Sequence, residues 1–415
     1  MSQLLLTSCQ AQSVPQSPQP LPLRTGAEEL FRHEYAIYGM RVAVVANQTS
    51  LVGERHLVDS LIASGANVVK IFCPEHGFRG TAAAGATIKD GKDERTGLPI
   101  ISLYGNNKKP TPEQLKDVDA VIFDLQDVGC RFYTYISTLH YVMEACAEAG
   151  IPLMVLDRPN PNGHYVDGPV LDTSKYRSFV GMHPVPVVYG LTIGEYARMI
   201  NGEHWLKNGV QSKLTVVPMQ GYRRDSVGYV LPVPPSPNLR NAHAIALYPS
   251  LCLFEGTNVS VGRKTPYPFE IVGIPAAMCS RACTPVSASC SYWNGSQKNI
   301  KPGTCTSTSF FVAGQKAPAF HFTPDGGKQC FGIDLQGIET PAKFDLSFLI
   351  TMYSITKSGS FFLKNNFFDK LAGNGELRRQ IEKGIPEEEI RASWEPALSE
   401  YKLIRKKYLI YPDGE

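Results

Sequence analysis

Acidic, amide and guanidinium side chains directly follow four apolar runs of this chain. They lie at Asn47–Thr49, Glu75–His76, Asp124–Asp127 and Asp157–Asn160. A carboxylate can act as a general acid or base, while amide and guanidinium groups hydrogen-bond hydroxyls and carboxylates. A single acid after a strand is as often a helix cap as a catalytic group. Four such positions together indicate a polar cleft suited to a sugar.

Glu75, in "FCPEHGFRG", is the leading candidate for a general acid. Its apolar neighbours Phe72 and Phe78 could remove water from the carboxyl group and favour its protonated form. The alternative is that Glu75 caps a helix or pairs with Arg79. His76 could hydrogen-bond a substrate hydroxyl, or it could be a buried imidazole with protein partners.

The segment "FDLQDVGCRFYTY" supplies further candidates. Asp124 and Asp127 could provide a second acid or orient a water, or they could simply hold Arg131 in place. Tyr133 and Tyr135 could stack on a sugar ring, whose apolar side packs against aromatic faces, or they could pack beneath the loop.

Composition and motifs exclude several classes of function. With 41 basic and 38 acidic residues the formal net charge is +3, too small for a broad nucleic-acid footprint. No G-x-G-x-x-G follows the first apolar run, and the stretch Gly80–Thr87 has Ala86 where a phosphate loop needs lysine. The G-x-S-x-G and H-E-x-x-H motifs are also absent. We therefore expect no nucleotide, metal or other cofactor.

Alternating strand and helix patterns would position the candidate residues. Buried strands are predicted at Arg41–Thr49, Asn67–Glu75, Pro99–Gly105, Asp119–Asp127 and Pro152–Asn160. Helices are predicted at His56–Gly65, Thr111–Asp117 and Tyr135–Gly150. This order predicts an α/β fold with a Rossmann-like, mostly parallel sheet flanked by helices over residues 39–240. Ligands bind such sheets at the carboxyl ends of the strands.

The proline-rich stretch Leu231–Asn241 predicts a rigid crossing to a second part of the chain. We expect residues 241–415 to form a smaller α/β domain that completes the cleft. Its expected elements are a strand at Cys330–Gly337 and helices near Phe344–Thr356, Phe367–Lys383 and Glu387–Lys407.

Residues 1–38 are interpreted as a signal remnant, a tether and a lead-in. "LTSC" at Leu6–Cys9 has the shape of a lipoprotein cut site, but the apolar stretch before it is shorter than the ~7–15 residues of a signal. A truncated start predicts export, to the periplasm or as a membrane-anchored lipoprotein. A chance match predicts a cytoplasmic protein. No apolar run reaches the ~18 residues of a membrane-spanning helix.

The ten cysteines form no recognisable metal motif. Those that lie within apolar segments, and are predicted core residues, are Cys73, Cys146 and Cys252. A crowded, aperiodic stretch contains Cys279, Cys283, Cys290 and Cys305. We expect this stretch to be an irregular insertion, with disulfides if the protein is exported.

Six segments in the same order resemble the NamZ-type exo-β-N-acetylmuramidase family. They are "PEHGFRG", "TGLPIISLYG", "FDLQDVGCRFYTYISTL", "VLDRPNPNG", "PPSPNL" and "FEGTNVSVGR". The resemblance implies release of terminal N-acetylmuramic acid from the non-reducing ends of peptidoglycan glycans such as MurNAc–GlcNAc, in a cleft between two domains. The family pattern usually continues "SVGR" with Gly-Thr, whereas this chain has Lys264–Thr265, which predicts less backbone freedom there.

The same resemblance makes Glu255 the leading second carboxylate, facing Glu75 across the cleft. Asn258 and Arg263 would then hold sugar hydroxyls, the N-acetyl group or the lactyl acid. The alternative role for Glu255 is a salt bridge between the domains.

Arg131 and Arg158 are further candidates for the lactyl carboxylate, because a guanidinium can bind a carboxylate through two hydrogen bonds. Ion pairs with Asp127 or Asp157 are the competing explanation. Asn160 is assigned to the substrate as well.

Two other functional classes remain open from the sequence. A binding protein could hold a muramyl sugar with the same side chains and not cleave it. An acyl or phosphoryl transferase is disfavoured because its motifs are absent. Glycoside cleavage needs two carboxyl groups ~5–5.5 Å apart for retention or ~6.5–9.5 Å apart for inversion.

Overall fold

The computed structural model describes most of the chain. The described residues are 21–33, 35, 37–78, 90–225, 229–280, 292–294, 309–312, 314–324, 327–357 and 359–413. The sequence-based interpretations of Leu6–Cys9, Arg79 and Gly80–Thr87 lie outside them, as do Cys283, Cys290 and Cys305.

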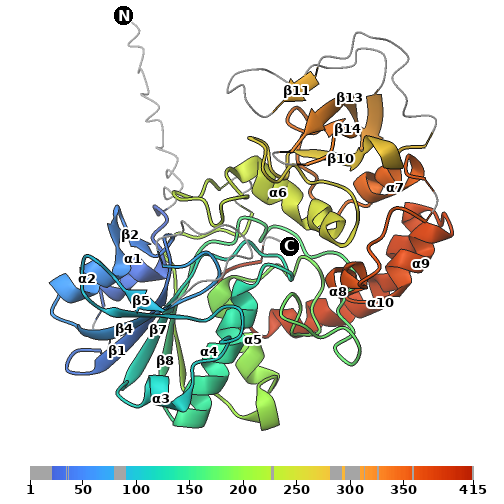
Figure 1. Cartoon of the computed structure of the whole chain (residues 1–415). Helices are drawn as coiled ribbons and strands as arrows, with labels where there is room; N and C mark the ends of the chain where they lie inside the picture. Colours follow the sequence, from blue (N-terminus) through green and yellow to red (C-terminus); the bar gives the residue numbers. More distant parts are fainter. Residues whose placement is uncertain are drawn as a thin grey trace, which may run out of the picture.

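A seven-stranded sheet organises the N-terminal half (Figure 1). Its order is β5-β6-β4-β1-β7-β8-β9, and every neighbouring pair is parallel except β5 with β6. The strands are β1 (Arg41–Ala46), β4 (Asn67–Cys73), β5 (Gly91–Lys92), β6 (Pro99–Ser102), β7 (Ala120–Asp124), β8 (Leu153–Leu156) and β9 (Leu214–Val217). The chain builds outward from β1 in both directions, so the strand order reverses beside β1 and β7. This confirms the predicted Rossmann-like sheet.

The predicted strands exist, but each ends two to four residues earlier than expected. Strand β4 ends at Cys73, so Glu75 lies in the following turn and not in the strand. In contrast, Asp124 is the last residue of β7 and is fully buried. This difference decides which carboxylates can reach a ligand.

Helices cover both faces of the sheet (Figure 1). One face packs against α1 (Gly26–Leu30) and α2 (Leu57–Ala63). The opposite face packs against α3 (Pro112–Leu115), α4 (Tyr135–Ala149) and α5 (Ile193–Gly202). Capping boxes begin α1, α3 and α5, while α4 ends at Gly150 in a left-handed conformation, φ 70°. A short hairpin of β2 (Leu51–Val52) and β3 (Arg55–His56) precedes α2.

The C-terminal half combines helices with a smaller, mainly antiparallel sheet. Helix α6 (Ala242–Leu251) continues into the 3₁₀ turn Cys252–Gly256. The sheet contains β10 (Ile271–Pro275), β11 (Tyr292–Asn294), β12 (Ser309–Val312), β13 (Gln315–Thr323) and β14 (Cys330–Asp334), with only the β11–β13 pair parallel. The helices are α7 (Ser347–Ser354), α8 (Phe367–Ala372), α9 (Glu376–Glu382) and α10 (Glu387–Lys406).

The single helix predicted over Phe367–Lys383 is wrong, because two helices occupy this range. Gly373 ends α8 with φ 81°, a left-handed conformation that favours glycine. A Cβ atom there would also lie 2.7 Å from Nη2 of Arg131. The break therefore brings the end of α8 close to a buried arginine of the N-terminal half.

The two halves share one core. The largest buried cluster includes Phe123 of β7 together with Phe254 and Ile274 of the C-terminal half. Helix α10 returns to the N-terminal half, where the Tyr401 hydroxyl donates to the Tyr189 carbonyl at 2.7 Å. The halves are therefore packed against each other and not merely tethered.

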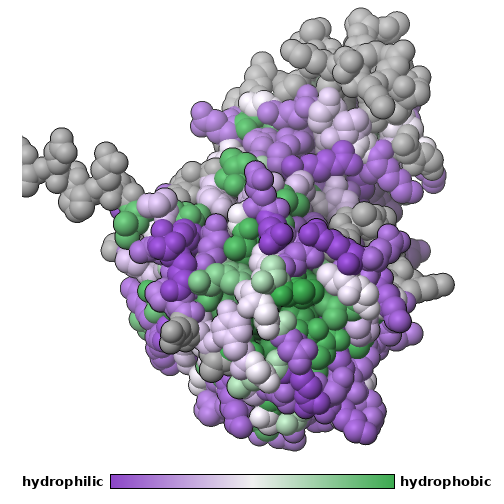
Figure 2. Space-filling view, turned by 90° about the vertical axis from the view of Figure 1, so that its left-hand side faces the viewer, coloured by the Kyte–Doolittle hydropathy of each residue, from purple (hydrophilic) through white to green (hydrophobic). Residues whose placement is uncertain are grey.

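Surface character differs between the halves. On the face shown in Figure 2, apolar residues gather over the lower body, while the coloured part of the upper lobe is largely hydrophilic. The exposed large apolar side chains of the described residues are Leu21, Phe31, Tyr38, Ile62, Val230 and Leu403. Only Leu403 belongs to the C-terminal half.

Among the described helices, none is both long and apolar enough to cross a membrane. The predicted core cysteines, Cys73, Cys146 and Cys252, are buried free thiols.

Candidate active site

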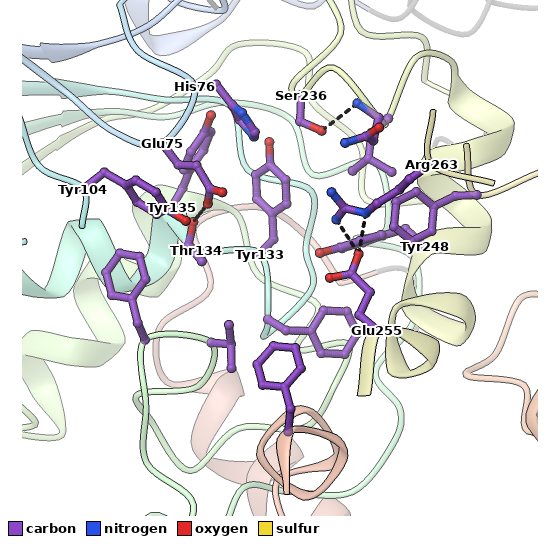
Figure 3. Close-up of a pocket in the computed structure, with 17 residues that line it drawn as sticks. Glu75, His76, Tyr104, Tyr133, Thr134, Tyr135, Ser236, Tyr248, Glu255 and Arg263 are labelled. Atoms are coloured by element: carbon purple, nitrogen blue, oxygen red, sulfur yellow. Dashed lines mark hydrogen bonds and ion pairs between the residues drawn. The ribbon is translucent and has the colours of Figure 1, made fainter. Parts of the chain in front are cut away.

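A cavity of about 330 Å³ lies where the carboxyl edge of the parallel sheet meets the C-terminal half (Figure 3). Six of the predicted site residues line it: Glu75, His76, Tyr133, Tyr135, Glu255 and Arg263. The other polar lining residues are Tyr104, Thr134, Ser236, Asn238 and Tyr248. Apolar side chains complete the wall: Phe132, Phe179, Val180, Leu239, Phe269 and Phe367.

Glu75 is partly exposed at the end of the cavity nearer the parallel sheet. The Thr134 hydroxyl donates to its Oε2 at 3.2 Å, and the Tyr104 hydroxyl is hydrogen-bonded to it as well. Burial, followed by the charge of Glu75, raises the pKa of Tyr104 to about 12, so this hydroxyl remains a donor. Phe72 and Phe78 pack into hydrophobic clusters on the two faces of the sheet, so they are not the apolar wall expected around Glu75.

The turn that carries Glu75 has an unusual backbone. His76 and Gly77 have φ values of 73° and 77°. A left-handed conformation at a non-glycine residue is sparsely populated and is often found at ligand sites. Two such residues in succession reverse the chain after β4, and both Glu75 and His76 line the cavity. His76 is only 6% exposed.

Tyr133 and Tyr135 line the cavity, but they are only 7% and 1% exposed, and their hydroxyls bind protein groups. Both hydroxyls donate to the Pro235 carbonyl, at 2.9 and 3.4 Å, and Tyr135 also accepts a bond of 2.8 Å from Asn47. The Gln48 side-chain amide binds the same segment through Pro234 and Pro235. The predicted crossing Leu231–Asn241 is thus fixed as a wall of the cavity, without helix or strand.

Glu255 lies in the 3₁₀ turn after α6 and faces the same cavity from the C-terminal half (Figure 3). Its Oε1 accepts bonds from Nε of Arg263, at 3.0 Å, and from Nη2. Both partners belong to the C-terminal half, so this pair is not the interdomain salt bridge considered from the sequence. The Arg263 guanidinium also lies 5.7 Å from the centre of the Phe269 ring.

Asp124 and Arg158 pair with each other beneath the site. Asp124 is fully buried and accepts bonds from Nε and Nη2 of Arg158 at 2.5 and 2.8 Å. Neither residue lines the cavity. Asp157, considered as the partner of Arg158, instead binds Thr192 and Tyr411. We therefore assign Asp124 and Arg158 to support of the sheet edge and not to the reaction.

Asp127 is also a buried support. It accepts bonds from the Tyr189 hydroxyl and from the Gly129 amide, the latter at 2.6 Å. Burial raises the pKa of Asp127 to about 7, while these hydrogen bonds act in the opposite direction. Oδ1 of Asp127 has no hydrogen-bond partner among the described residues. Because Asp127 is only 5% exposed and lies outside the cavity lining, it is poorly placed to contact a substrate.

Arg131 is fully buried and binds only backbone carbonyls. Its two terminal nitrogens donate to four of them at 2.6–2.9 Å: those of Pro169, Val185, Leu371 and Ala372. Both the expected lactyl contact and the expected ion pair are therefore replaced by a link between the two halves.

The two predicted asparagines are held by backbone groups. Asn160 donates to the Leu191 carbonyl at 2.8 Å, and it lies so close to Gly129 that no larger residue would fit at position 129. Asn258 donates to the Ser360 carbonyl at 2.9 Å. Neither lines the cavity.

Sequence reasoning missed Tyr104 and Thr134, which both contact Glu75. Tyr104 follows β6 in "PIISLYG", so the strand-end rule that selected Glu75 could have selected it. Thr134 lies between two chosen tyrosines. Phe179, Tyr248 and Phe269 gave no comparable signal, because they come from segments without a parallel strand. Within the described residues, His, Cys, Asp and Glu side chains form no group of three that could hold a metal ion.

Comparisons with known proteins agree with this architecture. The family model described as exo-β-N-acetylmuramidase NamZ, N-terminal, matches residues 42–243, and the corresponding C-terminal model matches residues 246–411. The peptidoglycan β-N-acetylmuramidase NamZ of Bacillus subtilis (strain 168) is 39% identical over 404 residues, covering 94% of this chain and 91% of that protein.

Two crystal structures of DUF1343 family proteins from Bacteroides fragilis NCTC 9343 have similar folds. The first has a TM-score of 0.76 and 40% identity, covering 95% of this chain and all of the other. The second has a TM-score of 0.74 and 27% identity, covering 94% and 99%. The chain therefore belongs to the exo-β-N-acetylmuramidase NamZ family of glycoside hydrolases.

Proposed function

We propose that this protein releases N-acetylmuramic acid from the non-reducing ends of peptidoglycan fragments, with Glu75 and Glu255 as the two reacting carboxyl groups. The strongest support is their position: they come from different halves of the chain and line one cavity with aromatic walls. Glycoside hydrolysis uses such a pair, one protonated to assist the leaving oxygen and one ionised.

The surroundings of the two groups suggest which role each takes. Glu75 is hydrogen-bonded by the hydroxyls of Thr134 and Tyr104. A hydroxyl can form a hydrogen bond with either the protonated or the ionised form of a carboxyl group. Glu255 forms an ion pair with Arg263, which suits it to the second role of such a pair. Glu75 would then protonate the glycosidic oxygen, while Glu255 acts on the anomeric carbon directly or through a water.

The aromatic walls fit the substrate class. A sugar ring has an apolar side that packs on aromatic faces, and the rings of Tyr133, Tyr135 and Tyr248 line the cavity. Asn238 and Ser236 add polar groups along the crossing segment. Arg263 uses Nε and Nη2 for Glu255, which leaves Nη1 for a substrate oxygen.

The Glu75→Gln variant tests this proposal with the disaccharide MurNAc–GlcNAc. Loss of a general acid should lower kcat by about 10²–10⁴-fold, because only the reaction needs the proton. Calorimetric binding of the disaccharide should be retained. The matched control is Glu94→Gln, an exposed carboxylate outside the cavity lining, which should leave kcat unchanged.

Other outcomes are equally informative. A wild-type kcat in Glu75→Gln would show that Glu75 is not a reacting group. Lost binding without a separate loss of kcat would support a sugar-holding role for Glu75.

We also propose that the protein is exported, because peptidoglycan lies outside the cytoplasm. Cell fractionation followed by detection of the full-length chain tests this. Recovery in the cytoplasm alone would favour a chance match of "LTSC" to a lipoprotein motif.

A further inference from the structure

We propose that Lys108, held over the ring of Phe179 beside the cavity, binds a carboxylate carried by the glycan substrate. This inference rests on the proposed function, which requires the cavity to accept an acidic sugar. It addresses a gap in the site: Arg131 and Arg158 are buried against protein groups, and Arg263 is shared with Glu255.

Phe179 forms a fixed part of the cavity wall. The Ser137 hydroxyl donates to its carbonyl at 2.7 Å, and the Tyr141 ring stacks with it at a centroid distance of 6.3 Å. The ring of Tyr104, which is hydrogen-bonded to Glu75, also lies 6.3 Å from the Phe179 ring. Phe179 therefore belongs to the Glu75 side of the cavity, and helix α4 fixes its position.

Lys108 is not itself among the lining residues, but it places a positive charge next to this wall. Its Nζ lies 4.8 Å from the centre of the Phe179 ring, and its side chain is partly exposed. A contact of this kind is weak for a partly exposed ammonium group and leaves its N–H groups available.

The neighbouring lysine shows that Lys108 is different. Lys109 forms ion pairs of 2.7 Å with both Glu144 and Glu148. No ion pair of Lys108 occurs within the described residues, whereas the adjacent Lys109 pairs with two carboxylates. A cation without a carboxylate, oriented by a ring that lines the cavity, is a site suited to an external carboxylate.

Two parts of a peptidoglycan fragment carry this chemistry. One is the lactyl group of the terminal muramic acid, and the other is an acidic residue of a stem peptide. The lactyl group is favoured, because it lies on the sugar that the cavity itself would hold. The two sources can be separated by substrate choice.

The test uses full-length Lys108→Met with MurNAc–GlcNAc and with the same disaccharide whose lactyl acid is converted to a neutral methylamide. For the acid we expect KM to rise about 3- to 30-fold with kcat within about twofold, because one charge-assisted contact is lost. For the methylamide we expect no change. Lys108→Arg should restore most of the affinity, and added salt should reduce the difference between wild type and Lys108→Met.

Lys116→Met is the matched control, since Lys116 is an exposed cation for which no contact with Phe179 or with the cavity is found. Lys116→Met should leave KM and kcat unchanged for both substrates. An equal KM for the acid in wild type and Lys108→Met would overturn assignment to the lactyl group. A peptide-bearing fragment is assayed as a third substrate, and an effect restricted to it would assign the carboxylate to the stem peptide instead.

Binding without turnover separates this inference from the proposed function. Free N-acetylmuramic acid and N-acetylglucosamine are titrated calorimetrically into wild type and Lys108→Met. Lys108→Met should lose the preference for the acidic sugar even if the disaccharide is never cleaved. If the wild type shows no such preference, or if the variant keeps it, Lys108 does not bind the carboxylate.

Discussion

The carboxylates of the parallel sheet edge fall into two regions with opposite properties. Glu75 lies in a turn beyond β4 and reaches the cavity, whereas Asp124 and Asp127 lie in or just after β7 and are buried. All three were selected by the same argument, that strand ends collect functional groups. The difference shows that this rule locates the correct edge but does not say which side chains remain accessible.

Backbone conformation explains the two outcomes. Asp124 still belongs to strand β7, so its side chain must point toward one packed face of the sheet. There it forms an ion pair with Arg158. Glu75 has left the strand, and the left-handed residues His76 and Gly77 reverse the chain around it. The following predictions test this division between cavity and support, from the largest expected effect to the smallest.

Asp124→Asn should be the most damaging change to stability. It leaves the buried Arg158 without its ionic partner, which typically costs ~3–5 kcal/mol of the free energy of unfolding. Protein that remains folded should keep its kcat, because Asp124 does not line the cavity. Urea unfolding and steady-state kinetics on the same preparation check both statements.

The control lies at the other end of the same strand. Asp119, just before β7, pairs with Arg41, and both side chains are well exposed, at 39% and 46%. Asp119→Asn should therefore cost less than ~1 kcal/mol. If Asp124→Asn keeps wild-type stability but loses turnover, Asp124 belongs to the reaction and the division fails.

Glu255→Gln should show the reverse pattern. We expect kcat to fall by at least about 10²-fold, since a reacting carboxylate is lost, while the free energy of unfolding changes by less than ~1 kcal/mol. The small cost reflects the partial exposure of Glu255 and Arg263, at 24% and 38%. Glu376→Gln, which breaks an exposed pair with Arg379, is the control and should retain kcat. A change in kcat below threefold would contradict the proposed pair of reacting groups.

Asp127 should make stability depend on pH. Its pKa is about 7 in the folded protein, mainly because burial raises it from the ordinary value of 3.8. Between about pH 4 and pH 7 the unfolded chain has lost this proton while the folded protein keeps it. The contribution of Asp127 therefore decreases stability as pH rises through this window, by up to ~1.4 kcal/mol per pH unit, and is constant below it.

Asp127→Asn removes this titration, so the difference in unfolding free energy between variant and wild type should grow in favour of the variant from pH 4 to pH 7. Asp225→Asn is the control, because the pKa of Asp225 lies below its usual range next to Arg223. Parallel stability curves for Asp127→Asn and wild type would show that Asp127 is not a buried acid.

The sequence predicted the parallel sheet, its strand positions and six residues of the cavity, because period and turn residues act locally. It could not tell Arg131 and Arg158 from Arg263. All three are arginines near acidic residues, but two are covered by packing that joins distant segments, such as the contact between Arg131 and Leu371. Burial of this kind depends on the folded chain as a whole. The same holds for Phe179, which is held at the cavity by contacts with α4 and with Tyr104.

The smallest predicted effect concerns the loop that presents Arg263. Lys264 has φ 63°, a conformation that costs a residue with a side chain more than it costs glycine. The fold keeps this left-handed turn although lysine occupies the position. Relief of this backbone cost should raise the free energy of unfolding of Lys264→Gly by ~0.5–1 kcal/mol. The greater flexibility that glycine gives the unfolded chain offsets part of this gain. Thermal unfolding measures this directly.

Lys175→Gly is the control. Lys175 is an exposed turn residue without a left-handed backbone conformation, so this change should lower stability instead. If Lys264→Gly also lowers the free energy of unfolding, the lysine side chain makes a stabilising contact that outweighs its backbone cost. The loop that presents Arg263 would then be held by side-chain contacts, as the sheet edge around Asp124 is, and would differ from the turn that carries Glu75.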